Sequence, residues 1–248
     1  MTALFQDPQD QQALRKLVVQ VCRLMYDKNL IPASDGNVSV RWGNKYLIIT
    51  PAGVFKGLLQ PQDLVITDLQ GIPAPEDIAP RNGLRPSGEL HTHLTAYRQR
   101  PDVRAVVHAH APITTALSVA GISMAPCVLP ETLVTVGTIA TTAYANPTSE
   151  QMSTIIRDLV REHDALVLDR HGAMTVGSSL LKAYALMEKV EHTAQVLLYA
   201  HLLGKVQLLA PEDIRHLSAL RDTMLGPGRH FQGPDCAICG ACEGLGDN

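Results

Sequence analysis

Two histidines separated by one residue, His108 and His110, form the strongest local pattern for chemistry in this chain. Apolar residues predict a strand over 103–109, and residues i and i+2 of a strand share one face, with Cα atoms about 7 Å apart. Two imidazoles on one face can bind the same cation, with Zn–N bonds of about 2.0–2.1 Å. Ala109 should point the other way, into the core. Because 10 histidines in 248 residues give about 0.4 such pairs by chance, the pair is a hypothesis about a metal site.

A second pair with the same spacing, His91 and His93, lies where the sequence predicts a helix over 87–97 with Ser87 as its N-cap. Residues i and i+2 of a helix point in different directions, so these two imidazoles cannot easily share an ion. We therefore expect His91 and His93 to be structural, or to support the ligands of a site from behind.

Three further segments carry polar groups or turns that suit a site. His171-Gly172 follows an apolar strand predicted over 165–169, a place from which side chains reach into clefts, although an ordinary loop histidine has the same pattern. Glu89 falls in the first turn of the predicted helix, near amides that can hold an anion, and is also a common residue at helix starts. The turns at 36–37 and 52–53 could form nests of backbone amides for an anion.

The elements that must position these residues mix helices and strands irregularly. Helical spacing of apolar residues predicts helices, short apolar runs bounded by turn residues predict strands, and Gly43-Asn44 between two such runs predicts a β-hairpin. The helices are predicted over 11–29, 87–97, 112–120, 149–162, 178–203 and 211–225, and the strands over 38–40, 46–50, 64–67, 103–109 and 165–169. Since this order lacks strict βαβ alternation, we expect an α/β fold, a single-domain three-layer sandwich with a mainly antiparallel central sheet flanked by helices.

The composition argues against several other classes of protein. The chain has 21 Lys and Arg against 24 Asp and Glu, a net charge of −3, so it lacks the excess of cations that nucleic-acid binding needs. A hydrophobic content of 46% argues against intrinsic disorder. No apolar run approaches the ~20 residues that span a membrane. We expect no nucleic acid and no membrane as a partner.

The first residues and two of the cysteines bear on the compartment. Residues 1–10 lack the apolar stretch of a signal peptide. Cys22 and Cys127 lie in apolar segments and fit buried free thiols. We therefore expect a cytoplasmic protein.

The C-terminal segment differs in composition from the rest of the chain. We expect one domain over 1–225 and a Gly-rich tail over 226–248 that lies outside the core. Cys236, Cys239 and Cys242 in this tail fit metal binding, for which three thiolates leave one ligand missing, or a flexible thiol-bearing segment, which we favour.

Taken in order along the chain, the site segments resemble the class II aldolase/adducin family. The resemblance runs over roughly residues 12–210 and is closest to the L-fuculose-1-phosphate aldolase branch of the family, with which an epimerase branch shares the fold. Five motifs carry it, namely S-D-G-N-V-S, I-T-P-A-G, P-S-G-E, V-V-H-A-H-A and R-H-G-A-M-T-V-G.

The resemblance implies a role for each residue that matches a family motif. The three ligands of a Zn²⁺ ion, for which Mn²⁺ or Co²⁺ could substitute, match His108, His110 and His171. Glu89 matches the carboxylate that serves as acid/base. Three neutral imidazoles with an open fourth position are typical of catalytic rather than structural zinc. The positions that correspond to the lining of a substrate phosphate pocket are Gly36, Asn37, Gly53, Ser87 and Gly88.

The activity that the resemblance implies is that of a metal-dependent aldolase. Such a lyase cleaves a ketose phosphate or similar hydroxyketone through a metal-stabilised enediolate, giving dihydroxyacetone phosphate and an aldehyde. The sugar-phosphate 4-epimerases carry Asp where this chain has Glu89 and Lys where it has Thr50, which favours aldol cleavage. The three retained histidines argue against a non-catalytic adducin-like interaction protein. Dehydration of a methylthioribulose phosphate and decarboxylation of a β-keto or aromatic acid stay as alternatives.

Several departures from the family pattern concern the substrate rather than the metal. Ala52 and Gly88 each replace a hydroxyl-bearing residue of the phosphate pocket, so side-chain donors are lost. The tyrosine that protonates the leaving aldehyde aligns near Leu129, and Glu131 could act instead or be a solvated carboxylate at the start of a loop. The resemblance also implies a homotetramer that acts on a small-molecule sugar or sugar phosphate.

Overall fold

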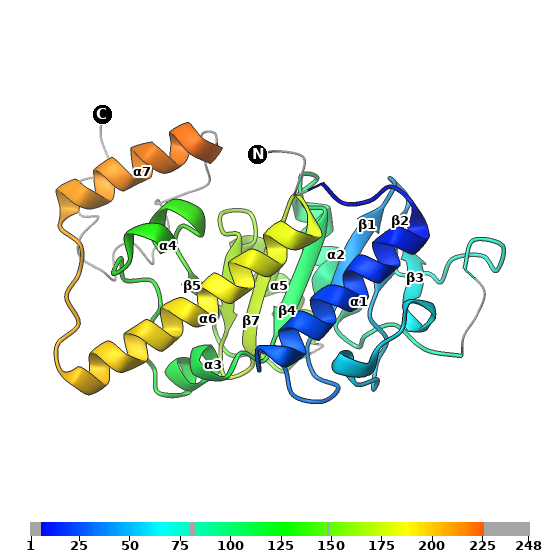
Figure 1. The fold of residues 1–248 in the computed structure, drawn as a ribbon, viewed down its shortest axis with the longest axis horizontal. Coiled ribbons are helices and arrows are strands. Elements are labelled where there is room, and N and C mark those ends of the chain that lie inside the picture. Colours follow the sequence, from blue (N-terminus) through cyan, green and yellow to red (C-terminus); the bar gives the residue numbers. More distant parts are fainter. Residues whose placement is uncertain (1–5, 80–82, 148, 226–248) are drawn as a thin grey trace.

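A seven-stranded sheet forms the middle layer of the molecule in the computed structural model, which describes residues 6–79, 83–147 and 149–225 (Figure 1). Its strand order is β3-β2-β1-β4-β7-β6-β5, and every neighbouring pair is antiparallel except β5 and β6. The strands are β1 Asn37–Trp42, β2 Tyr46–Ile49, β3 Val65–Asp68, β4 Ala105–Ala109, β5 Ala140–Thr141, β6 Ala165–Leu168 and β7 Gly172–Gly177. The predicted α/β sandwich with a mainly antiparallel sheet is confirmed.

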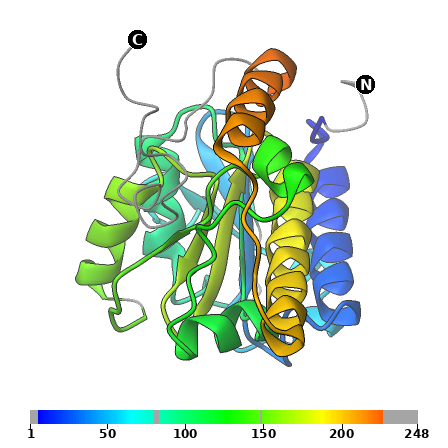
Figure 2. The ribbon, with the colours of Figure 1, turned by 90° about the vertical axis from the view of Figure 1, so that its left-hand side faces the viewer.

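Helices cover both faces of this sheet, as the side view in Figure 2 shows. One face packs against α1, α3 and α6, and the other against α2 and α5. Helices α4 and α7 pack against each other beyond the end of the sheet, and the 3-10 helices η2 and η3 connect β2 to β3. The helices are α1 Gln11–Asp27, η2 Lys56–Leu58, η3 Pro61–Asp63, α2 Leu90–Gln99, α3 Pro112–Val119, α4 Pro130–Thr135, α5 Glu150–Leu159, α6 Leu180–Leu203 and α7 Pro211–Leu225.

Side chains alternate between the two faces of β4, so this strand can contribute residues both to the core and to the site. Ala105, Val107 and Ala109 are fully buried in the cluster under α1 and α6, so the expected inward direction of Ala109 is confirmed. Val106 lies in the opposite cluster with α2 and α5. His108 shares the face of Val106, because strand side chains alternate with a period of two. The histidine therefore emerges on the side of the sheet where α2 begins.

The start of α2 differs from its prediction. The helix begins at Leu90 with Glu89 at the N-cap position, so the expected N-cap role of Ser87 is wrong. The backbone of Ser87 instead pairs with Thr50, its amide donating to the Thr50 carbonyl at 3.0 Å. The Ser87 hydroxyl accepts a hydrogen bond from the amide of Glu89 at 3.3 Å. This pairing holds Ser87 in a turn and delays the first helical residue.

Two strands and one α-helix were not predicted, namely β5, β7 and α4, and neither were the 3-10 helices η2 and η3. Strand β7 lies between β4 and β6 and is buried on both faces, so its sequence lacks the polar alternation that marks a half-exposed strand. Strand β5 and helix α4 have only two and six residues. Elements this short carry little periodicity in sequence.

The described residues bear on two expectations, one for the cysteines and one for membrane-spanning segments. Cys22 and Cys127 are buried free thiols, as expected, and burial raises the pKa of Cys22 to about 12. No helix in the described part of the chain is long and apolar enough to cross a membrane. Cys236, Cys239 and Cys242 lie outside the described residues, and the tail over 226–248 stays a prediction.

Two glycines allow backbone segments to come unusually close to the end of β4. Gly36 has φ +65°, and a Cβ atom there would lie 2.8 Å from the carbonyl oxygen of His108 and 2.5 Å from a methyl of Ile31. At Gly172 a Cβ would lie 2.2 Å from the carbonyl oxygen of Ala109. Only glycine fits at these positions. The turns that contain Gly36 and Gly172 therefore pack directly against β4.

Gly36 and Gly43 offer a matched pair that separates close packing from backbone strain. Both have φ near +60°, but a Cβ at Gly43 would meet no atom within 4 Å. Gly43→Ala should cost about 1–2 kcal/mol of unfolding free energy, from the left-handed backbone alone. Gly36→Ala should cost at least about 1 kcal/mol more, because its methyl group must displace neighbouring atoms. Urea unfolding of both variants measures the difference, and equal losses would contradict the close approach.

Candidate metal centre

Four side chains from separate segments converge at one end of the sheet. Glu89 precedes α2, His108 lies on β4, His110 follows β4, and His171 lies in the turn between β6 and β7. One ligand atom from each of the four lies within 4.8 Å of all the others. The imidazole centroids are 5.1 Å apart for His108 and His110, 4.8 Å for His108 and His171, and 4.7 Å for His110 and His171. Such a group could hold one divalent cation.

Two of the imidazoles are oriented by hydrogen bonds on the nitrogen that faces away from the group. His108 Nδ1 lies 2.9 Å from the carbonyl oxygen of Ala173 on the neighbouring strand, and His110 Nδ1 lies 3.1 Å from a carboxylate oxygen of Asp35. Because both partners can only accept, each Nδ1 carries the proton and each Nε2 keeps a free lone pair. His108 Nε2 is buried and has no hydrogen-bond partner within the described structure. Metal-binding histidines use this arrangement.

The turn that carries His171 is held by its neighbours. Arg170 has φ +57°, a left-handed conformation that costs energy for a non-glycine residue. The Ser118 hydroxyl donates to the Asp169 carboxylate at 2.7 Å and accepts from the Arg170 amide at 2.8 Å. These bonds stabilise the turn and direct His171 toward the other two imidazoles. The sequence pattern V-L-D-R-H-G alone does not show this support.

The electrostatics of the four groups suits a cation. Burial lowers the pKa of His108, His110 and His171, so their lone pairs are available at neutral pH. Burial acts to raise the pKa of Glu89, but the nearby imidazoles of His108 and His171, together with other neighbours, outweigh it and lower that pKa. A largely buried carboxylate therefore faces imidazole lone pairs, of which that of His108 Nε2 is buried and has no hydrogen-bond partner in the described structure. A divalent ion would satisfy both, so the donor set fits a metal.

Behind Glu89 lies a second group of buried polar side chains, which we call the Glu89 chain. It runs from Tyr97 through Ser39, His93 and Asn37 to Glu89. Tyr97 Oη lies 2.8 Å from Ser39 Oγ, and Ser39 Oγ lies 2.6 Å from His93 Nδ1. His93 Nε2 lies 2.5 Å from Asn37 Oδ1, and Asn37 Nδ2 lies 2.7 Å from Glu89 Oε2. Burial lowers the pKa of His93 to about 3, so its ring is neutral.

The expected supporting role of His93 fits this position, whereas His91 is exposed on the outer side of α2. Sequence reasoning compared His91 with His93 as a pair two residues apart. The informative spacing was four, because Glu89, His93 and Tyr97 lie on one side of a helix. Asp35 was also missed as the partner of His110, although it stands in the S-D-G-N turn.

The residues expected to line a phosphate pocket are drawn together by backbone pairing. The Ala52 amide donates to the Arg85 carbonyl at 3.0 Å, and Pro51 pairs with Pro86, so the turn at 50–53 lies beside the turn at 86–88. Within these turns Gly53 and Gly88 are exposed, and Ser87 is nearly buried. The backbone of both glycines is accessible to an anion.

Two other residues expected to line a phosphate pocket, Asn37 and Gly36, are held by contacts within the protein. The Asn37 side chain is engaged by Glu89 and His93, as part of the Glu89 chain. Gly36 is buried against β4. Their role in binding a phosphate stays a prediction.

A buried lysine beside the turn at 50–53 was not predicted. Lys56 Nζ donates to the carbonyl oxygens of Ser34 at 2.7 Å and Val54 at 3.0 Å, so it ties the turn before Gly36 to the turn that holds Gly53. Burial lowers the pKa of Lys56. A single lysine inside the apolar stretch V-F-K-G-L-L was the available signal, since lysine is almost never fully buried without partners.

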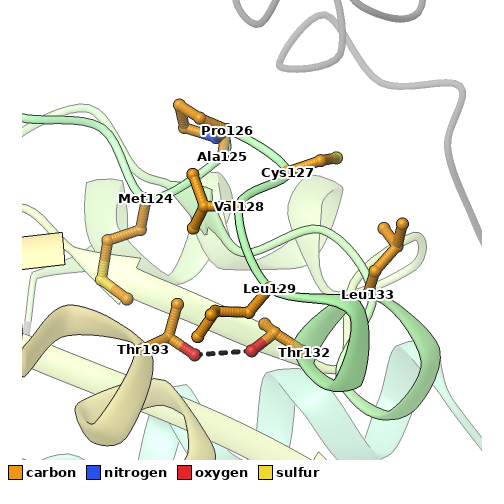
Figure 3. Close-up of a pocket in the computed structure, with 10 residues that line it drawn as sticks. Met124, Ala125, Pro126, Cys127, Val128, Leu129, Thr132, Leu133 and Thr193 are labelled. Carbon is orange, nitrogen blue, oxygen red and sulfur yellow. Dashed lines mark hydrogen bonds between the residues drawn. The ribbon is translucent and has the colours of Figure 1, made fainter. Parts of the chain in front are cut away.

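Glu131 is not brought into the group of Glu89 and the three histidines. It is exposed in the first turn of α4. Leu129, just before it, lines a small pocket together with Met124 and other apolar residues, next to the bond between the hydroxyls of Thr132 and Thr193 (Figure 3). Within one chain, neither residue supplies a second polar group to the site.

Known proteins were compared with the chain in sequence and in structure. The sequence model of the family described as "Class II Aldolase and Adducin N-terminal domain" matches residues 16–198. An L-fuculose phosphate aldolase of Methanococcus maripaludis is 33% identical over 180 residues, which cover 72% of this chain and 92% of that protein. A 3-oxo-tetronate 4-phosphate decarboxylase of Escherichia coli is 28% identical over 215 residues, which cover 84% and 93%.

A solved structure of an aldolase is also similar to the fold of this chain. The L-fuculose-1-phosphate aldolase from Thermus thermophilus matches with a TM-score of 0.67 and 33% sequence identity, covering 79% of this chain and 98% of that chain.

The geometry of the four groups predicts that one divalent cation binds per chain and that His108 is needed for it. Losing a supporting partner of a metal ligand typically weakens binding about 10–100-fold, so His108→Ala should weaken Zn²⁺ binding by at least about 100-fold. His91→Ala is the matched control, since His91 is exposed and outside the group. Equilibrium dialysis with Zn²⁺ measures both, and unchanged binding by His108→Ala would remove it from the ligand set.

Proposed function

Because the chain belongs to the class II aldolase and adducin N-terminal domain family, we propose that it is a metal-dependent lyase. Its reaction is the aldol cleavage of a ketose phosphate or similar hydroxyketone into dihydroxyacetone phosphate and an aldehyde. The observation that carries the proposal is the convergence of one carboxylate and three imidazoles, with one ligand atom of each within 4.8 Å of the others. Three imidazole nitrogens beside a carboxylate suit metal-assisted cleavage of a ketone, because a bound metal would polarise the carbonyl group and the carboxylate can transfer the proton.

His108, His110 and His171 would hold the metal, for which we propose Zn²⁺, with Mn²⁺ or Co²⁺ as substitutes. When bound, the ion supplies a Lewis acid that polarises the ketone of the substrate. The residues of the chain keep the imidazoles neutral and oriented, through Ala173 behind His108 and Asp35 behind His110. The Ser118 and Asp169 side chains hold the turn of His171.

Glu89 is the acid/base of the proposed reaction. Aldol cleavage takes a proton from the hydroxyl group of the fragment that becomes the aldehyde, and it adds a proton to the carbon that the broken bond leaves electron-rich. The lowered pKa keeps the Glu89 carboxylate ionised at neutral pH, and its place next to the imidazoles of His108 and His171 lets it take the first proton and return one to carbon. Asn37 holds one carboxylate oxygen, so the orientation of the group is fixed before substrate binds.

The substrate phosphate would bind where the turns at 50–53 and 86–88 meet. The exposed backbones of Gly53 and Gly88 can approach an anion closely. Ser87 lies between them, and the buried cation of Lys56 stands behind the Gly53 turn. Backbone amides and one lysine thus compensate for the side-chain hydroxyls that are absent at Ala52 and Gly88.

Decarboxylation of a 3-oxo acid phosphate is the second candidate, and two observations favour it. A 3-oxo-tetronate 4-phosphate decarboxylase of Escherichia coli is 28% identical over 84% of the chain. Aldol cleavage also benefits from an acid near the leaving aldehyde, where this chain has the apolar Leu129 and the exposed Glu131. Loss of CO₂ needs no such acid. It leaves an electron-rich carbon beside the ketone, which again requires only a proton.

A product assay with the zinc-loaded protein tests the proposal and separates the two candidates. L-fuculose 1-phosphate, related ketose phosphates and 3-oxo-tetronate 4-phosphate are supplied in turn, and aldehyde, dihydroxyacetone phosphate and CO₂ are measured. An aldehyde together with dihydroxyacetone phosphate supports aldol cleavage, and CO₂ without an aldehyde supports decarboxylation. Absence of all three products at saturating metal would contradict the proposed lyase.

Glu89→Gln is the matched variant in the same assay. The amide keeps the shape of the side chain but cannot accept a proton, so turnover should fall at least about 100-fold while bound zinc is retained. Turnover equal to that of the parent protein would remove Glu89 from the reaction.

The proposal includes a cytoplasmic homotetramer. Buried free thiols at Cys22 and Cys127 support a reducing compartment. Tyr199, Leu202 and Leu203 at the end of α6 are exposed, a grouping that suits contact with another copy of the chain. Light scattering should give about four times the chain mass of 26.8 kDa, and a monomer mass would contradict the assembly.

A further inference from the structure

The Glu89 chain arises because the repeats of a strand and a helix nearly coincide. Asn37 and Ser39 are two residues apart on β1, which places both side chains on the face toward α2. Glu89, His93 and Tyr97 are four apart and follow one side of α2. Two residues of an antiparallel strand span about 6.8 Å and four residues of a helix about 6.0 Å. The two rows therefore stay in register across the interface.

Each contact of the chain joins one residue of the strand to one of the helix. Asn37 contacts Glu89 and His93, and Ser39 contacts His93 and Tyr97. Ser39, His93 and Tyr97 are almost completely buried, so water does not offer alternative partners. Arg41, two residues further along β1, packs its guanidinium 4.8 Å from the Tyr97 ring centroid.

The carboxylate of Glu89 decides the direction of every hydrogen bond in the Glu89 chain. A carboxylate oxygen only accepts, so Asn37 must present its NH₂ group to Glu89 Oε2 and its carbonyl oxygen to His93. His93 must then donate from Nε2, which leaves its Nδ1 as an acceptor. Ser39 donates to that Nδ1 and accepts from the Tyr97 hydroxyl. Every donor in the chain thus points toward Glu89.

We propose that His93 and Ser39 are positioning residues for the reaction of Glu89, because they lock the Asn37 amide in the one orientation that donates to the carboxylate. Without the donor at His93, the Asn37 carbonyl oxygen loses its buried partner, and only the hydrogen bond to Glu89 still holds the amide. The amide and the carboxylate that it binds at 2.7 Å could then move together, away from the place of Glu89 beside His108 and His171. The role of Glu89 as acid/base rests on the proposed function, but the direction of the hydrogen bonds in the Glu89 chain does not.

The tautomer of His93 tests the direction of the hydrogen bonds in the Glu89 chain, and its measurement needs no substrate. Nitrogen-15 NMR of histidine-labelled, folded protein distinguishes a protonated ring nitrogen from a bare one. The chain requires a neutral His93 with the proton on Nε2 and none on Nδ1. A proton on Nδ1, or on both nitrogens, would overturn the proposed direction, whatever the outcome of the cleavage assay.

Turnover of variants tests the positioning role itself, using the substrate that the product assay identifies. His93→Leu removes both polar contacts, and kcat should fall at least about 10-fold with little change in KM or zinc content. His93→Gln should recover most of that loss, because its amide can accept from Ser39 and donate to Asn37 in the same direction. Equal losses for Leu and Gln would show a role in packing only and overturn the proposal.

A matched pair of hydroxyl deletions completes the test. Ser39→Ala removes the donor to His93, and should lower kcat and change the Nδ1 signal of His93, because that nitrogen loses its hydrogen bond. Thr67→Val removes a hydroxyl that is equally buried in the sheet, on β3, and has no hydrogen-bond partner in the described structure. It should leave kcat and the His93 signal unchanged. A Ser39→Ala variant as active as Thr67→Val, with an unchanged Nδ1 signal of His93, would contradict the proposal.

Discussion

The close approach of two turns to the end of β4 is the constraint on which the site depends. Gly36 and Gly172 lie so near the carbonyl oxygens of His108 and Ala109 that a side-chain carbon at either position would overlap them. This approach sets Asn37 opposite His108 in the β1–β4 register and begins β7 beside β4. His171, which directly precedes Gly172, is thereby brought against His108 and His110. Without the two glycines the ligands would be present in sequence but not in one place.

The convergence of Glu89 and the three histidines lowers the stability of the folded protein, but it serves the proposed chemistry. Buried nitrogen lone pairs and a buried carboxylate lose hydration, and His108 Nε2 gains no partner from the described protein atoms in return. A divalent ion would offset that cost, which couples metal binding to stability. The outer atoms of His108, His110 and Glu89 are hydrogen-bonded by contrast, to Ala173, Asp35 and Asn37. The protein thus keeps the outer atoms fixed and leaves the inner atoms available.

Sequence patterns predicted the elements better than the contacts between them. Strand periodicity alone placed His108 and His110 on one face, but Glu89 and His171 joined them only through the resemblance to family motifs, because distant segments meet through sheet order. The helix start was misplaced at Ser87, since backbone pairing with Thr50 overrides its capping tendency. The Glu89 chain was readable in principle from E-x3-H-x3-Y beside N-x-S. Its recognition required knowing that β1 lies against α2.

The account as a whole claims that one metal ion is held by three histidines beside Glu89. A crystal of the zinc-loaded protein measured on both sides of the zinc absorption edge tests this most directly, because anomalous scattering locates the metal independently of any assigned role. The account predicts one peak per chain, within bonding distance of nitrogens from His108, His110 and His171. A fully occupied peak elsewhere, with these imidazoles unbound, would contradict it.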